Sequence, residues 1–196
     1  MKTLNLTNHN RGIKMIVLMA GFIIVFGTLS IHSALGQTQN LVSVKQQGMK
    51  KLAILAGDWE GEGWFAGRDG SRSTFKQTEK IQWKLDGTVM QIEGRGIDTG
   101  QGEKRGKVIH NAMAVVTYNQ DSNTYQFNSY LATGQSTVAK GEFNENGDFV
   151  WGFEANGGRI RYTITISDNQ WHETGEFLRP DGQSFQFIEM TLNKVQ

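Results

Sequence analysis

The pattern of hydrophobic and polar positions changes once along the chain. Near residues 41–55, apolar or small residues recur at helical spacing, which predicts one short helix over 43–56, with Ser43 as its N-cap and Gly57 as its end. After Gly57 the helical period is lost, and apolar and polar residues alternate with a period of two. That period is typical of strands with one buried face. The helical positions are Leu41, Val44, Gly48, Leu52 and Leu55.

The alternating segments are separated by short turn sequences such as Asp86-Gly87, Asn146-Gly147 and Pro180-Asp181-Gly182. Turns of this kind between alternating segments predict β-hairpins. The connections are too short for crossover helices, so an antiparallel up-and-down meander is expected to close into a barrel of about eight to ten strands. The predicted fold class is all-β with one short N-terminal helix. The strands are expected near 59–66, 74–84, 88–97, 107–118, 124–131, 136–143, 148–154, 159–166, 171–178 and 184–192.

The register of the hairpin at Asp86-Gly87 follows from its two faces. One face is apolar and the other carries paired charges, so the apolar face is expected inside the barrel. This register also places Gln77 and Glu79 inside. The expected pairs are Trp83 with Met90, Ile81 with Ile92, Glu79 with Gly94, Lys80 with Glu93 and Thr78 with Arg95.

The two last hairpins bring further carboxylates to an aromatic face. A two-residue turn at Asp168-Asn169 places Glu173 on the face that holds Tyr162 and Trp171. A three-residue loop over 180–182 pairs Phe177 with Phe185 and Glu173 with Glu189, with Phe187 on the same side. A slip of one residue in either register would turn these carboxylates outward.

The first predicted strand carries glycine at alternate positions. Trp59, Gly61, Gly63 and Phe65 share one face, and Trp59 is expected to close the barrel end beneath the helix. Glycines in a strand permit it to bend, and they also leave room on the face they occupy. The sequence leaves both interpretations of Gly61 and Gly63 open.

The N-terminal segment predicts export. Lys2, Arg11 and Lys14 precede an apolar run over 15–29, and small residues follow up to Gly36, as in a secretory signal peptide over 1–36 cleaved before Gln37. The alternative, a membrane anchor, needs about 20 apolar residues, and this run is shorter. Residues 37–196 are then expected to form a single β-barrel domain.

Removal of the signal peptide changes the charge balance. Without its three basic residues, the 20 Lys+Arg fall to 17 against 19 Asp+Glu, a formal charge of −2. No basic stripe remains that would indicate a nucleic-acid or membrane partner. The chain has no cysteine, so neither disulfides nor lipidation are expected, and a soluble secreted or periplasmic protein is predicted.

Several of these segments resemble known families. A short helix followed by Gly57-Asp58-Trp59 resembles the calycin superfamily, and "LAGDWEGEGW" also resembles, more distantly, the opening of nitrobindin-type barrels. The ordered set "TEKIQWKLDGTVMQIEG", "HNAMAVVTYN", "WGFEANGGRIRYTI" and "WHETGEFLRPDGQSFQFIEMTL" resembles an uncharacterised family of bacterial exported lipocalin-like domains. That resemblance spans nearly all of 37–196 and implies a fold and export, but no activity.

The nitrobindin resemblance implies haem bound through a histidine. After residue 36 the histidines are His110 and His172, and neither lies in a stretch that matches that ligand position. No cofactor is therefore expected. "HETGE" is no metal site either, since on a strand its ends lie about 13 Å apart. G-x-S-x-G and P-loop motifs are absent from the sequence, and no catalytic residue is assigned.

Inward carboxylates are the best lead to function. Buried carboxylates must be protonated, paired, hydrated or bound to a ligand, and no interior Lys or Arg is evident from the pattern. The ligand is therefore expected to be neutral or cationic and partly apolar. An interaction module with a filled barrel and an enzyme that uses the interior glutamates as acid and base are the alternatives, with binding preferred to catalysis. The candidate cavity residues are Trp59, Gln77, Glu79, Tyr162, Trp171, Glu173, Phe187 and Glu189.

Overall fold

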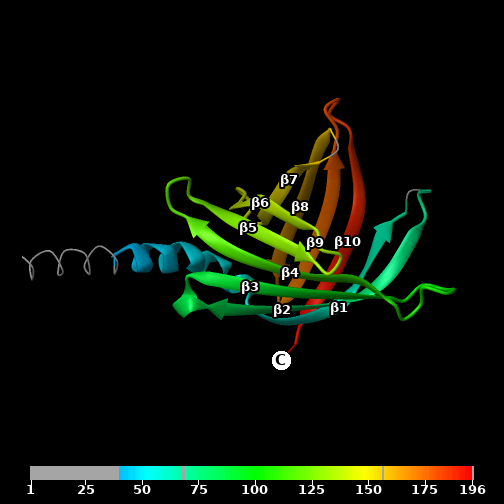
Figure 1. The fold of residues 1–196 in the computed structure, drawn as a ribbon, viewed down its shortest axis with the longest axis horizontal. Helices are drawn as coiled ribbons and strands as arrows, with labels where there is room; N and C mark the ends of the chain where they lie inside the picture. The colour runs from blue at the N-terminus through cyan, green and yellow to red at the C-terminus, as the bar shows by residue number, and fades with distance from the viewer. Residues whose placement is uncertain (1–39, 68, 156, 196) are drawn as a thin grey trace, which may run out of the picture. The chain divides into compact units, whose positions relative to one another are not determined.

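Ten antiparallel strands form a closed barrel (Figure 1). The computed structural model describes residues 40–67, 69–155 and 157–195, so the predicted signal peptide over 1–36 lies outside the described residues. Each strand pairs with its neighbours in sequence, and β1 pairs with β10, which confirms the predicted all-β barrel. The strands are β1 (Gly57–Ala66), β2 (Arg72–Lys84), β3 (Val89–Asp98), β4 (Val108–Asn119), β5 (Thr124–Leu131), β6 (Ser136–Phe143), β7 (Phe149–Ala155), β8 (Gly158–Ser167), β9 (Gln170–Leu178) and β10 (Ser184–Lys194).

The helix that precedes β1 differs from the prediction at its start. Residues 40–49 are α-helical, and the 3-10 helix η1 (Lys50–Leu55) continues them. Ser43 lies inside the helix, where its Oγ donates a hydrogen bond to the Asn40 carbonyl at 2.8 Å, so its assignment as N-cap is wrong. Gly57 follows η1 with φ of +128°, a left-handed value that favours glycine, and the chain enters β1 there.

Residues 49–55 close one end of the barrel. Met49, Leu52 and Leu55 are buried in the same cluster as Trp59, whose side chain is 1% exposed. The indole Nε1 of Trp59 donates a hydrogen bond to the Leu55 carbonyl at 2.8 Å. Its ring meets the Trp171 ring edge to face, with centroids 5.7 Å apart. The predicted role of Trp59, closing the barrel beneath the helical segment, is confirmed.

Gly61 and Gly63 permit β1 to approach β10. A Cβ on Gly61 would collide with the Thr191 carbonyl oxygen, and a Cβ on Gly63 would lie 2.7 Å from both Met190 and Phe75. The space beside these glycines is therefore occupied by β10 and by Phe75. They serve the bend and close packing of the sheet, and they do not enlarge the interior.

Two of the three predicted registers are confirmed. β2 and β3 pair Glu79 with Gly94 and Lys80 with Glu93, and β8 and β9 pair Ile164 with Glu173. The 3-10 turn η2 (Leu85–Gly87) joins β2 to β3 without changing this register.

The predicted register between β9 and β10 is wrong beyond its first pairs. Phe177 pairs with Phe185 as expected, but an irregularity between Gln186 and Ile188 adds one residue to β10. Glu173 consequently pairs with Met190, and Glu189 lies on the outer face of the sheet. A bulge inserts one residue on one strand, and a slip of one residue exchanges the two faces.

Among the described residues, no helix is both long enough and apolar enough to cross a membrane.

The closed end supplies a test of the fold. Trp59→Ala is expected to lower the free energy of unfolding by about 3–5 kcal/mol, because it removes a fully buried ring and its hydrogen bond to η1. Urea unfolding followed by circular dichroism measures this loss. As a control, Trp83→Ala removes a ring that is 36% exposed and is expected to cost less than about half as much. Equal losses for the two variants would contradict the assigned role of Trp59.

Candidate functional site

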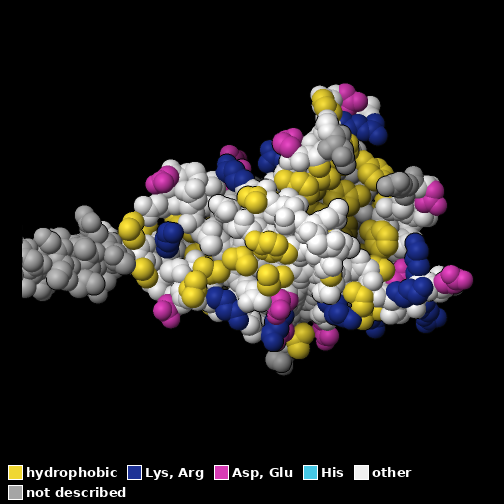
Figure 2. Space-filling view, in the orientation of Figure 1, with side chains coloured by type: hydrophobic (Ala, Val, Ile, Leu, Met, Phe, Trp, Pro, Cys, Tyr) yellow, Lys and Arg dark blue, Asp and Glu magenta, His cyan; other side chains and the backbone are white. Residues whose placement is uncertain are grey.

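The barrel encloses a cavity of about 370 Å³. It extends from Leu52 and Leu55 at the closed end to Leu131, Gln135 and Phe153 near the opposite end. Figure 2 shows hydrophobic side chains gathered in the hollow at that open end. The volume lies within the range of ligand pockets, about 300–1,000 Å³. The interior is therefore hollow and is not filled by the protein's own aromatic side chains.

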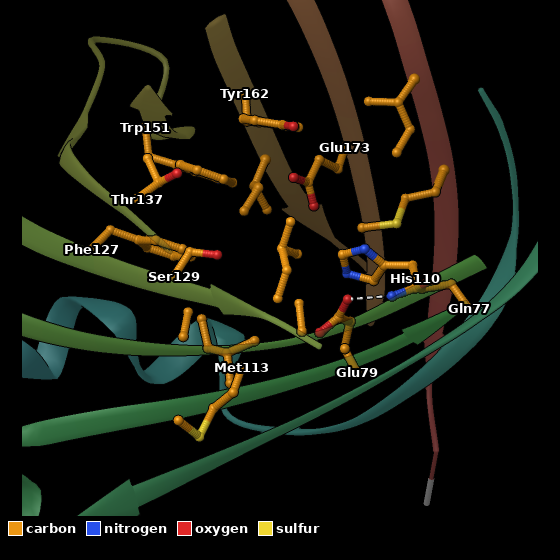
Figure 3. Close-up of a pocket in the computed structure, with 18 of the residues that line it drawn as sticks. Gln77, Glu79, His110, Met113, Phe127, Ser129, Thr137, Trp151, Tyr162 and Glu173 are labelled. Carbon is orange, nitrogen blue, oxygen red and sulfur yellow. Dashed lines mark hydrogen bonds between the residues drawn. The ribbon is translucent and has the colours of Figure 1, made fainter. Parts of the chain in front are cut away.

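Glu79 on β2 is one of two buried carboxylates in this cavity. Its Oε1 accepts a hydrogen bond of 2.7 Å from Gln77 Nε2 (Figure 3). A Cβ on the facing Gly94 would lie 2.7 Å from Glu79 Oε1, and a Cβ on Gly96 would lie 2.7 Å from Gln77 Oε1. The two glycines of β3 thus make room for the carboxylate and the amide. Burial raises the pKa of Glu79 to about 7, and the hydrogen bond from Gln77 opposes this shift.

Glu173 on β9 is the second buried carboxylate. Its Oε2 accepts a hydrogen bond of 3.1 Å from Trp171 Nε1. Burial raises the pKa of Glu173 to about 8, and the negative charge of Glu79 adds to the increase. In Figure 3 the two carboxyl groups are directed into the same space, Glu79 from β2 and Glu173 from β9. Because the two groups repel each other, they lose their protons as a coupled pair.

No lysine or arginine lines the cavity among the described residues. The titratable groups that share the space with the two glutamates are His110 and Tyr162. Burial lowers the pKa of His110, so its imidazole is mostly neutral at pH 7. The pKa of Tyr162 is raised by burial and by the charge of Glu173, so its phenol keeps its proton. Among the described lining residues, no cation therefore compensates the two carboxylates.

A stack of aromatic rings forms another part of the lining. Trp151 lies between Phe127 and Tyr162, with ring centroids 4.3 Å and 4.1 Å apart and planes within about 11° of parallel. Ser129 and Thr137 add hydroxyl groups to the lining from β5 and β6. The cavity thus combines a broad apolar surface with a few polar groups, an arrangement typical of small-molecule sites.

Five of the eight predicted cavity residues line this cavity, namely Gln77, Glu79, Tyr162, Trp171 and Glu173. The other three do not.

Trp59 lies in the closed end against Trp171. Phe187 lies at the β10 irregularity, where its ring meets that of Tyr162 at 5.7 Å. Neither residue lines the cavity, so both are wrong as lining residues: Trp59 is packed into the closed end, and Phe187 lies at the irregularity of β10.

Glu189 is also wrong as a cavity residue. The additional residue in β10 turns it to the outer face, where its side chain is 39% exposed. There its Oε1 lies 3.2 Å from His172 Nε2, and its Oε2 accepts a hydrogen bond of 3.0 Å from Gln186 Nε2. His172 belongs to this outer cluster and does not line the cavity.

His110 and the Phe127–Trp151 part of the stack were not predicted as cavity residues. Alternation along β4 places His110 on the inward face with Ala112, Ala114 and Val116, so this pattern was available in the sequence. The stack offers no such pattern, because Phe127 and Trp151 come from strands that do not pair with each other.

The comparisons with known proteins concern the fold. No family model matches the sequence, and no curated protein matches it. Similar solved structures include Rv2717c from M. tuberculosis, with a TM-score of 0.58 and 9% identity over 76% of this chain and 98% of that one. They also include the S-type phycobiliprotein lyase CPES from Guillardia theta, with a TM-score of 0.54 and 11% identity over 74% of this chain and 90% of that one. The likeness is one of fold alone. Together with the ten-stranded barrel it fits a lipocalin-like fold.

Within 40–67, 69–155 and 157–195, no group of three or more metal-ligating side chains lies close enough together to hold a metal ion.

The buried carboxylates predict an unusual dependence of stability on pH. The pKa of Glu173 is about 8 in the folded protein and near 4.5 when unfolded, so the folded state binds more protons between these values. The stabilising contribution of Glu173 to the free energy of unfolding is fully present below about pH 4.5. It is lost as pH rises toward about 8. Glu173→Gln removes this loss, so its free energy of unfolding relative to wild type is expected to rise over that interval by up to a few kcal/mol.

Urea unfolding at pH values between about 5 and 8.5 measures this difference. The matched control is Glu189→Gln, since Glu189 is partly exposed and its pKa is lowered by hydrogen bonding to His172. That variant is not expected to gain stability relative to wild type as pH rises. Parallel curves for wild type and Glu173→Gln would show that Glu173 is not buried in the folded protein.

Proposed function

We propose that this protein is exported and binds a partly apolar small molecule, neutral or cationic, inside its barrel. The observation that supports this proposal is the hollow interior: an open cavity of about 370 Å³ holds two buried carboxyl groups and has no lysine or arginine in its described lining. A protein that needed only a stable core would fill this volume, since interiors are close-packed. It would also avoid buried carboxylates, which weaken the folded state when they ionise.

The lining contains both apolar and hydrogen-bonding groups, as the two ends of such a ligand require. Ile92, Val116, Ile164 and Met190 provide an apolar surface for the body of the ligand. Glu79 and Glu173, with Tyr162 beside them, provide hydrogen-bonding groups for a polar head. An anionic ligand such as a fatty acid would meet two carboxyl groups and no compensating cation, so fatty acids are disfavoured.

Acid–base catalysis is the second candidate function. Two carboxyl groups with raised pKa in one cavity are the arrangement that general acid–base chemistry uses. One similar structure is named a phycobiliprotein lyase, and the same fold can serve more than one function. The hollow interior gives less support to the third candidate, an interaction module with a filled barrel.

Export is tested by the N-terminus of the mature protein. Expression of the full chain in a bacterial host is expected to yield a protein that begins at or near Gln37, because the apolar run over 15–29 and the small residues up to Gly36 form a cleavable signal. Edman sequencing of the periplasmic or secreted fraction determines this end. Recovery of a form that retains 15–29 in the membrane fraction would overturn the export proposal.

Binding is tested with the neutral fluorescent probe N-phenyl-naphthylamine. Its emission is expected to increase in the presence of the protein, because the ring enters an apolar cavity. Ala112→Trp places a large side chain in the lining and is expected to reduce the increase at least about fivefold, since it occupies ligand volume. Val138→Trp adds the same ring at a position that is 68% exposed and is expected to bind the probe like wild type. Equal probe binding by both variants would show that the probe binds outside the cavity.

A further inference from the structure

The carboxyl groups in the cavity have unused hydrogen-bonding capacity. Glu79 accepts a hydrogen bond at Oε1 and Glu173 at Oε2, and among the described residues no donor reaches the other oxygen of either group. A carboxylate accepts several hydrogen bonds, so each group can take a further donor. The free oxygens belong to a cavity that is open to ligands.

A third acid shares the inward side of the barrel. Asp98, at the end of β3, is 3% exposed, and its Oδ1 accepts a hydrogen bond of 2.9 Å from the Gly100 amide. Asp98 is thus engaged by its own loop, whereas Glu79 and Glu173 have an oxygen free. Basic side chains pair with acids on the outer face instead, as Arg161 does with Glu176 at 2.7 Å. The inward side of the barrel therefore holds three acids, and no lysine or arginine lines its cavity among the described residues.

We propose that the cavity selects an amphiphile with one protonated amine, whose N–H groups bind at the Glu79–Glu173 pair. This inference rests on the proposed function and specifies its ligand class. An ammonium group carries three donors and no acceptor, which matches oxygens that lack donors. A single positive charge matches a pair of which one member is ionised and the other keeps its proton, because two like charges in an apolar cavity do not ionise together at low cost.

The two tryptophans of the lining are poorly placed to bind a quaternary ammonium head. Quaternary cations bind over the faces of aromatic rings. Both faces of Trp151 are covered, by Phe127 and by Tyr162, and the Trp171 ring packs against Trp59. A head group that donates hydrogen bonds is therefore favoured over one that is only charged.

Binding of such a ligand is expected to depend on pH. The pKa of Glu79 is raised to about 7 and that of Glu173 to about 8, whereas a simple alkyl amine keeps its proton in this range. The other titratable groups that line the cavity are His110, mostly neutral above pH 7, and Tyr162, which stays protonated. Affinity for the amine is thus expected to increase from about pH 6 to about pH 9 as the pair releases a proton to solvent.

Four ligands with the same decyl chain test the proposal: decylamine, decanol, decanoate and decyltrimethylammonium. Each is titrated against the full mature protein at about pH 8, with displacement of N-phenyl-naphthylamine as the readout. Decylamine is expected to bind at least about tenfold more tightly than decanol, because hydrogen bonds to a charged group are stronger than those between neutral groups. Decanoate is expected to bind more weakly than decanol, and decyltrimethylammonium more weakly than decylamine.

Variants then test whether Glu79 and Glu173 cause the preference for the amine over the alcohol. Replacement of both acids, Glu79→Gln with Glu173→Gln, is expected to bring the amine-to-alcohol affinity ratio close to one, because no charged acceptor then remains at the pair. The outer variant Glu189→Gln is expected to keep the wild-type ratio. If the double variant does not fold, Glu173→Gln alone and the pH dependence of the wild-type ratio provide the same test.

The outcomes distinguish this inference from the proposed function. If decanol and the probe bind but decylamine has no advantage, the amine proposal is overturned and a hollow binding barrel remains. If decyltrimethylammonium matches decylamine, hydrogen bonding at the pair is overturned. If neither the probe nor any decyl ligand binds, both the amine proposal and the proposed function are overturned.

Discussion

Closure of the sheet between β1 and β10 requires two positions without side chains. At Gly61 a Cβ would collide with backbone atoms of β10, and at Gly63 it would meet both β10 and the Phe75 ring. With these contacts made, every described strand has a partner on both sides, and the meander has no exposed edge. Trp59, two residues before Gly61, holds η1 against the same end of the barrel through its bond to Leu55. The strand that closes the sheet therefore also anchors the segment that closes the end.

The interior is shaped by small residues as much as by large ones. Gly94 and Gly96 on β3 leave the volume into which Glu79 and Gln77 extend from β2. A larger residue at Gly94 would displace the carboxylate of Glu79, so the glycine and the acid form a matched pair across the hairpin. Such positions reduce the apolar area that the core can bury. This loss of buried apolar area is consistent with a binding site, since binding surfaces commonly reduce the stability of the fold.

The sequence predicts those features of the structure that a short local segment determines, and it fails where residues farther along the strand decide. Hairpins with short turns are local, and the pairings of Glu79 with Gly94 and of Glu173 with Ile164 follow from the turn and the alternation of faces. The loop before β10 fixes only the first pairs, so the additional residue near Phe187 reversed the expected side of Glu189.

The cavity itself depends on contacts between strands that are not neighbours. Trp151 stacks on Phe127 across the width of β6, and the sequence carries no local pattern for that contact. The acids of the site were therefore predictable from two hairpins, whereas its aromatic lining required the packed structure.

The two acids of the cavity have no basic partner among the described lining residues. The hairpin of β8 and β9 places Arg161 opposite Glu176 on its outer face, so the same pair of strands has a basic residue close at hand. On its inner face it places Ile164 opposite Glu173. An internal ion pair would satisfy the carboxylate and occupy the space, and nothing would be left for a ligand to neutralise. The unpaired acid costs stability as pH rises, and a cation in the cavity would restore that stability by mass action. The loss of stability with rising pH and the proposed selectivity for a cation thus have the same physical cause.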